Sequence, residues 1–176
     1  LRGTFTLTAE GQSDSNIRRI FTTGFQSEWK STMERQLLTI SPKARLLSVD
    51  YGKNPKDYQA APIKITFRYE IPDYALKGEG EMFFRPMVMN NLYNQVRSYL
   101  RIDTSVENRK YGFKDGCSRL VELDEMIQLP AGYKLVNAAK NEMMQGVGAD
   151  FEGSLTQKGN KVLLHNRLAL KKRVYE

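Results

Sequence analysis

The chain has 176 residues, of which 40% are hydrophobic, with a formal net charge of +7, one cysteine and one histidine. These numbers exclude a disulfide within the chain and leave too few cysteine and histidine ligands for a four-ligand zinc site. No apolar run approaches the ~20 residues of a membrane-spanning helix. The basic residues are spread along the sequence, so we interpret the charge as that of a solvated surface and not of a nucleic-acid or membrane interface.

The chain begins at Leu1 without an initiator methionine, and no charged segment followed by an apolar one marks a signal peptide. We therefore expect it to be part of a longer protein. Its length fits one domain, or two small ones that share a core.

The first predicted elements are a strand and a long helix. Residues 4–8 alternate between threonine and apolar side chains, which is typical of a strand. Over residues 16–38, apolar side chains recur every three or four positions and form one stripe: Ile17, Ile20, Phe21, Phe25, Trp29, Met33 and Leu37. We expect one long helix here, with Gly24 inside it, which packs against a sheet and ends before Pro42.

Two strands and a loop follow the helix. Residues 45–51 predict a second strand, and residues 52–62 form a loop by their Gly, Asn and Pro content. Residues 63–71 alternate strictly, which predicts one buried and one wet face. The expected buried side chains are Ile63, Ile65, Phe67, Tyr69 and Ile71.

The next part of the chain is also predicted to be β-rich. Residues 74–86 favour a hairpin, whereas residues 87–105 fit either a helix or an irregular loop. Alternation returns at residues 119–129, and a short strand is expected over residues 133–136.

A hairpin closes the chain, because residues 151–156 and 162–171 alternate on either side of a turn at Lys158-Gly159-Asn160. We predict a mostly β (α+β) fold of antiparallel, β-sandwich-like sheets, with one long N-terminal helix packed against a sheet. A strand–helix–strand unit over residues 1–52 precedes a sandwich-like module over residues 62–176, and the two are expected to share a core.

The single cysteine and the single histidine are the first candidates for catalysis. Cys117 lies in a turn, where Lys114 and Arg119 could lower the pKa of its thiol. His165 lies in the middle of a strand among leucines. Neither has the surroundings of a cysteine-protease or transglutaminase nucleophile, and a strand histidine among leucines is more often structural, so we do not favour a Cys117–His165 catalytic dyad.

Carboxylates and aromatic side chains give two further candidates. Glu122 and Asp124 share one face of a strand and adjoin Glu125, and a carboxylate pair can hydrolyse glycosides. We interpret them as charges of the wet face. Aromatic residues on an open sheet can stack bases or sugars, but Phe67 and Tyr69 lie on the apolar side of their strand and favour core packing.

No glycine-rich phosphate loop or calcium-binding loop is present. The sequence therefore predicts no catalytic, cofactor-binding or metal-binding residues and no cofactor, and the chain is expected not to be an enzyme.

The segment over residues 125–137, EMIQLPAGYKLVN, is interpreted as a structural joint. Pro130 ends a strand because proline cannot donate a ladder hydrogen bond. Gly132 supplies the unusual dihedral angle of the turn, and Tyr133 is expected to pack back onto the sandwich.

Four stretches carry a resemblance to a known family: GTFTLTAEGQSDSNIRR, ENRKYGF, EMIQLPAGYKLV and FEGSLTQKGNKVLLHNRLALKK. They resemble the C-terminal non-catalytic domain of unknown function of bacterial transglutaminase-like proteins. The sequence departs from that pattern at Gly112, where the family often has proline, and at Asn137-Ala138-Ala139, where it often has a second Leu-Pro. The family's catalytic Cys, His and Asp would lie upstream of Leu1, so none is carried onto this chain.

The resemblance implies a non-catalytic accessory or interaction module that packs beside the transglutaminase-like core of the same parent chain, or docks a protein or glycan. It also implies export to the periplasm or cell surface. No nucleic acid and no membrane insertion are expected.

Two alternatives stay open. The seven methionines and many aromatic residues suit a stand-alone module that encloses a small hydrophobic ligand between helix and sheet. The third hypothesis is an enzyme that uses Cys117 or the acidic strand.

Overall fold

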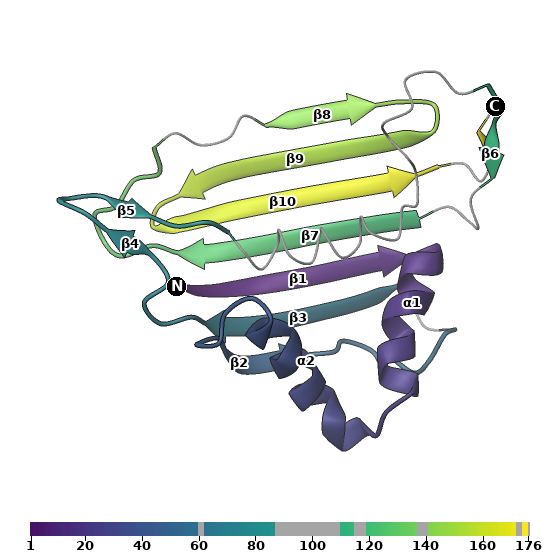
Figure 1. The fold of residues 1–176 in the computed structure, drawn as a ribbon, viewed down its shortest axis with the longest axis horizontal. Helices are drawn as coiled ribbons and strands as arrows, with labels where there is room; N and C mark the ends of the chain where they lie inside the picture. Colours follow the sequence, from purple (N-terminus) through teal and green to yellow (C-terminus); the bar gives the residue numbers. More distant parts are fainter. Residues whose placement is uncertain (60–61, 87–109, 115–118, 137–140, 172–173, 176) are drawn as a thin grey trace.

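A seven-stranded antiparallel sheet organises the computed structural model, which describes residues 1–59, 62–86, 110–114, 119–136, 141–171 and 174–175. The strand order is β2-β3-β1-β7-β10-β9-β8 (Figure 1). The bounds are β1 (Arg2–Glu10), β2 (Arg45–Asp50), β3 (Ile63–Glu70), β7 (Arg119–Gln128), β8 (Glu142–Gln145), β9 (Ala149–Lys158) and β10 (Lys161–Leu170). The prediction of a mostly β, antiparallel fold is confirmed.

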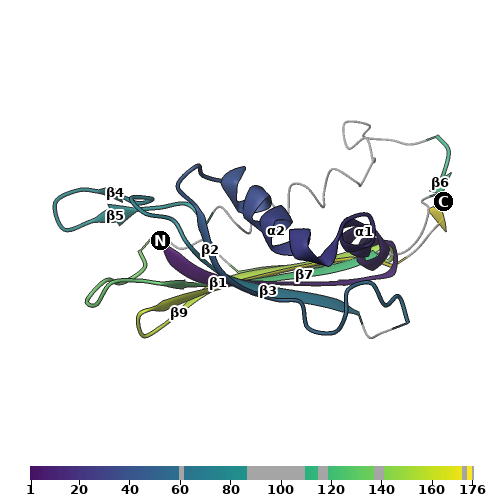
Figure 2. The ribbon, with the colours of Figure 1, turned by 90° about the horizontal axis from the view of Figure 1, so that it is seen from below.

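Two short antiparallel strand pairs accompany the large sheet. The first joins β4 (Leu76–Lys77) to β5 (Met82–Phe83), and the second joins β6 (Phe113–Lys114) to β11 (Val174–Tyr175). Helices α1 (Gly11–Thr22) and α2 (Trp29–Leu38) both lie on one side of the sheet, and the opposite side carries neither helix (Figure 2). Within the described residues, the second layer of the fold is therefore helical, and not the second sheet of a sandwich.

The prediction of one long helix over residues 16–38 is wrong. Helix α1 begins earlier, at Gly11, and ends at Thr22; a short 3₁₀ turn over Gln26–Glu28 leads into α2. Between them Phe25 has an extended backbone (φ −73°, ψ 147°), and its side chain is 77% exposed. Gly24 disfavours a continuous helix by about 1 kcal/mol. Because the apolar period runs through the break, it could not reveal that the stripe belongs to two helices.

Helix α1 is tied to the loop after β2 by a buried arginine. Arg18 is buried; its Nε donates to Asp14 Oδ2 (2.7 Å), and its Nη1 donates to the carbonyl of Asp57 (2.8 Å). The other carboxylate oxygen of Asp14 accepts a hydrogen bond from the amide of Ile63 (2.7 Å). The polar side chains near the start of α1 therefore connect the helix to the beginning of β3.

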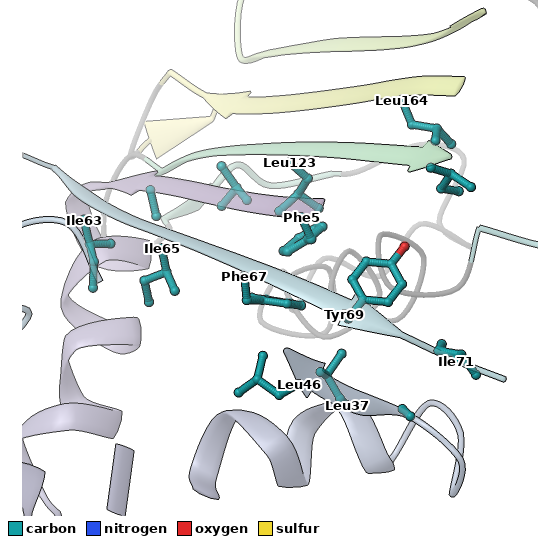
Figure 3. Packing of buried hydrophobic residues seen from close by; sticks show 14 of the residues in the cluster. Phe5, Leu37, Leu46, Ile63, Ile65, Phe67, Tyr69, Ile71, Leu123 and Leu164 are labelled. Atoms are coloured by element: carbon teal, nitrogen blue, oxygen red, sulfur yellow. The ribbon is translucent and has the colours of Figure 1, made fainter. Parts of the chain in front are cut away.

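The hydrophobic core fills the space between the sheet and the helices (Figure 3). Phe5 of β1 lies directly opposite Phe67 of β3, and their ring centroids are 5.1 Å apart. Leu37 of α2 and Phe21 of α1 close the core from the helical side. The predicted alternation of β3 is confirmed, because its odd-numbered residues are buried and its even-numbered ones are half-buried or exposed.

One glycine makes room for a polar contact inside this core. The Tyr69 hydroxyl donates a short hydrogen bond to the carboxylate of Glu125, and both side chains are buried. Register places Gly3 of β1 between Tyr69 of β3 and Ile127 of β7. A Cβ atom at Gly3 would come within 2.4 Å of the Tyr69 hydroxyl oxygen and 2.8 Å of the Met126 carbonyl oxygen. The tyrosine therefore reaches the glutamate across a position where only hydrogen fits.

The hydrogen-bonded hydroxyl stays protonated. Burial, and then the neighbouring carboxylate of Glu125, raise the pKa of Tyr69 far above its usual range. Tyr51 offers a contrast: it is packed edge-on against Phe21 and Trp29, but its hydroxyl has no hydrogen-bond partner within the described part of the chain.

We predict that Gly3→Ala lowers the free energy of unfolding by about 1–3 kcal/mol, because the added methyl group displaces Tyr69 or the β7 backbone. Urea denaturation measures the change. Gly78→Ala is the matched control, since a Cβ there meets no atom within 4 Å. Equal stability of the two variants would contradict the close approach at Gly3.

We predict that Tyr69→Phe costs about 1–3 kcal/mol of stability at neutral pH, since the buried Glu125 carboxylate loses a donor. Tyr51→Phe should be neutral or slightly stabilising, because it removes a hydroxyl that makes no hydrogen bond. The same denaturation experiment compares the two. If Tyr51→Phe lowered the free energy of unfolding as much as Tyr69→Phe, the prediction would be contradicted. The loss would then come from removing a hydroxyl group and not from removing its hydrogen bond to Glu125.

Candidate functional site

A groove of roughly 870 Å³ lies at the end of the sheet where β1 begins. One wall is the loop that follows β7, and the other is the β4–β5 hairpin, which projects beyond the sheet on the helical side (Figure 2). The lining residues are mostly apolar: Gly80, Glu81, Met82, Phe83, Phe84, Pro86, Leu129, Ala131, Gly132, Tyr133, Lys134, Leu135, Val136, Leu155 and Val162. We call it the apolar groove.

The loop wall is held in place by the β9–β10 hairpin. The amide of Leu129 donates to the carbonyl of Asn160 (2.7 Å). Gln157 of β9 accepts a hydrogen bond from the amide of Leu135 (2.6 Å) and donates to the carbonyl of Tyr133 (3.1 Å). A side chain therefore satisfies backbone groups that a neighbouring strand would otherwise pair. For this reason the predicted strand over residues 133–136 is wrong: the segment is a loop.

The turn residues of this loop behave as the sequence predicted, but its tyrosine does not. Gly132 has φ +86°, and Pro130 follows the end of β7. Tyr133 is 37% exposed and lines the groove, so the expectation that it packs back onto the sheet is wrong. The joint is therefore also the rim of a groove.

The hairpin wall presents one aromatic side chain to solvent and two residues to the core. Met82 and Phe84 pack against the hydrophobic core, whereas Phe83 between them is 61% exposed. The hydroxyl of Tyr74 donates to the carbonyl of Arg85 (2.6 Å) and closes the base of the hairpin. The exposed ring of Phe83 and the exposed side chain of Val136 thus face the same groove from opposite walls.

A smaller groove of roughly 420 Å³ adjoins the apolar groove and shares Met82, Phe84 and Leu129 with it. Its other lining residues include charged and polar groups: Arg2, Glu70, Asp73, Lys77 and Gln128. An apolar and a polar surface therefore meet at this end of the sheet.

The candidate catalytic residues do not gather at either groove. His165 Nδ1 lies 2.8 Å from Asp124 Oδ1, and Arg167 Nε donates to Glu122 Oε1 (3.0 Å), all on the sheet face without helices. Glu125 points to the opposite face, into the core. Cys117 lies outside the described residues. The structure thus places Glu122 and Asp124 on the wet face, each beside a basic partner.

Sequence reasoning missed the apolar groove. Its walls are an aromatic run over residues 82–84 and a Leu-Pro loop that lie far apart in the sequence, and no periodic pattern connects them. The one local signal is that MFF at positions 82–84 breaks the alternation of a strand and places an aromatic side chain on each face.

Among the residues that the structure describes, no three His, Cys, Asp or Glu side chains are grouped so that they could hold a metal ion. In the same part of the chain, every helix is too short or too polar to cross a membrane.

Residues 80–176 match a family described as a domain of unknown function with a solved structure (DUF3858). The chain belongs to this family. No curated protein and no solved structure gives a significant match to the chain. Nothing in these findings ties the domain to transglutaminase-like proteins, so that resemblance stays a prediction.

The DUF3858 match covers every lining residue of the apolar groove but not the whole sheet. It begins at Gly80, inside the β4–β5 hairpin, and so excludes β1, β2 and β3. Strand β7, within the match, pairs with β1, outside it, along the whole of β1. The matched segment and the residues before it therefore build one sheet.

We predict that residues 80–176 expressed alone do not fold cooperatively, because removal of β1 leaves β7 with a long unpaired edge and exposes the core face of Leu123 and Ile127. Thermal unfolding followed by circular dichroism, together with light scattering, compares the fragment with the full chain. A monomeric fragment with a sharp melting transition would contradict this prediction.

Proposed function

We propose that the chain is a non-catalytic interaction module of a larger protein, and that the apolar groove is where it holds an apolar segment of a neighbouring domain. The observation that supports this most is the pair of exposed side chains, Phe83 and Val136, on facing walls of a groove lined mainly by apolar residues. Contiguous exposed apolar surface of this kind is typical of interaction sites.

The resemblance of the sequence to transglutaminase-like proteins supports a specific neighbour, namely a transglutaminase-like core in the same parent chain. It also supports export to the periplasm or cell surface. The coding sequence upstream of Leu1 tests both: we expect an export signal and a domain with a cysteine followed at a distance by histidine and aspartate. A leader without such a domain would contradict the proposed neighbour.

A second candidate is a stand-alone module for a small hydrophobic ligand. The volume of the apolar groove falls within the range of about 300–1,000 Å³ usual for small-molecule sites. The groove lies between a hairpin, a loop and the sheet, and neither α1 nor α2 lines it. Native mass spectrometry separates the two candidates, because a co-purified ligand adds mass and a docking groove does not.

We predict that Phe83→Glu reduces binding of the apolar dye ANS to the native chain at least about threefold, since it places a charge in the groove. Phe25→Glu is the matched control: Phe25 is also exposed, at 77% against 61% for Phe83, and lies between the two helices. Fluorescence titration measures dye binding, and urea denaturation checks that both variants stay folded. Equal loss in the two folded variants would contradict the groove as the apolar site.

A further inference from the structure

The sheet face without helices carries a row of basic side chains at one end. Register across the strands places Arg45 of β2, Glu70 of β3, Arg2 of β1, Gln128 of β7, Lys161 of β10 and Lys158 of β9 in one line, all on the same face. We call Arg45, Arg2, Lys161 and Lys158 the basic row. All four are exposed. Five strand spacings of about 4.8 Å make the row about 24 Å long.

The charges of the basic row are mostly unpaired within the described residues. Arg2 Nε donates to Glu70 Oε1 (2.7 Å), and no carboxylate of the described chain lies within ion-pair distance of Arg45, Lys158 or Lys161. Arg68, in the next line of the same face, adds another exposed cation.

Three acidic side chains of the same face, in contrast, have basic partners. Glu122 pairs with Arg167, Asp124 with His165, and Asp150 with Lys171 (2.6 Å). The hydrogen bond from Lys171 lowers the pKa of Asp150. Glu10, Asp50 and Glu152 lie on the same face, and no ion pair within the described residues involves them. The face is therefore acidic toward one end and has uncompensated positive charge at the other.

We propose that the basic row binds an extended acidic polypeptide segment. A segment that crosses the strands would span about 24 Å with roughly seven residues at 3.4 Å each, and alternate side chains would point at the sheet. The width of such a single extended segment matches that of the basic row, which is one residue wide along each strand. A planar anionic membrane or a nucleic-acid duplex would also meet the acidic end of the face. Single-stranded nucleic acid would find few aromatic side chains on which its bases could stack, because the described residues on this face of the seven strands include no Phe, Tyr or Trp.

Binding across the strands uses side-chain charges alone, so it should depend strongly on salt. The distance over which exposed charges interact falls from about 30 Å at 0.01 M ionic strength to about 8 Å at 0.15 M. The probe is a fluorescein-labelled heptapeptide of alternating Glu and Thr, and the same peptide with Gln in place of Glu is its neutral counterpart. Fluorescence polarisation with the full chain, at both salt concentrations, measures binding.

We expect Lys161→Glu to weaken binding of the acidic peptide about fivefold or more at low salt, because an attractive pair becomes a repulsive one. Lys64→Glu is the matched control. Lys64 is exposed on the same face, near the acidic end, and its reversal changes the net charge by the same amount. It should weaken binding less than twofold, and both variants should keep the urea midpoint of the parent chain.

Three outcomes would overturn the proposal. The first is equal weakening by Lys161→Glu and Lys64→Glu, because it would show a response to net charge alone. The second is equal binding of the Gln and Glu peptides, and the third is tighter binding of oligothymidylate or phosphatidylserine vesicles than of the acidic peptide. Selective loss in Lys161→Glu, abolished by salt, would support it. These outcomes do not involve the apolar groove, so they are independent of the proposed function.

Discussion

The placement of β1 between β3 and β7 is the constraint on which the rest of the structure depends. Hydrogen bonding on both sides makes β1 a central strand, although it is the first element of the chain. Its register sets Phe5 beside Phe67 and leaves the space above Gly3 for the bond between Tyr69 and Glu125. Helix α1 follows directly from β1, α2 leads into β2, and both cover the face on which these side chains lie (Figure 2). A shift of one residue in β1 would turn Phe5 to water and a threonine to the core.

The two candidate surfaces lie on opposite faces of the same end of the sheet. The apolar groove is on the helical side, and the basic row is on the open side. The smaller groove lies between them, since Arg2, Glu70 and Gln128 line it and also belong to the charged line. One partner that wraps around this end could use both surfaces, its apolar residues in the groove and its acidic residues on the row. Arg2 and Gln128 form the physical link between the two.

Sequence reasoning succeeded where a pattern is local and periodic. Strict alternation predicted β3 and its buried face, and Gly159-Asn160 predicted the turn between β9 and β10, where Gly159 has φ +60°. It failed where the answer depends on tertiary contacts. The apolar period continues through the break between α1 and α2, so it does not reveal the break. Residues 133–136 bond to the side chain of Gln157 instead of to a strand. The short edge strand β8 has only exposed residues, so its sequence shows no alternation. The apolar groove could not be predicted from the sequence for the same reason, because its two walls come together only in the folded sheet.

The pairing of β1 with β7 also has a consequence for synthesis on the ribosome. About 110 residues separate the end of β1 from the start of β7, which corresponds to roughly 5–20 s of elongation at 5–20 residues per second. During that interval β1 can pair with β3 and be covered by the helices, but its other edge has no strand to meet. The nascent chain therefore carries an open edge whose threonine-rich sequence is half polar. Residues 3–9 contain no charged residue and no proline, which are the residues that protect natural edge strands, so until β7 emerges this edge can capture other chains.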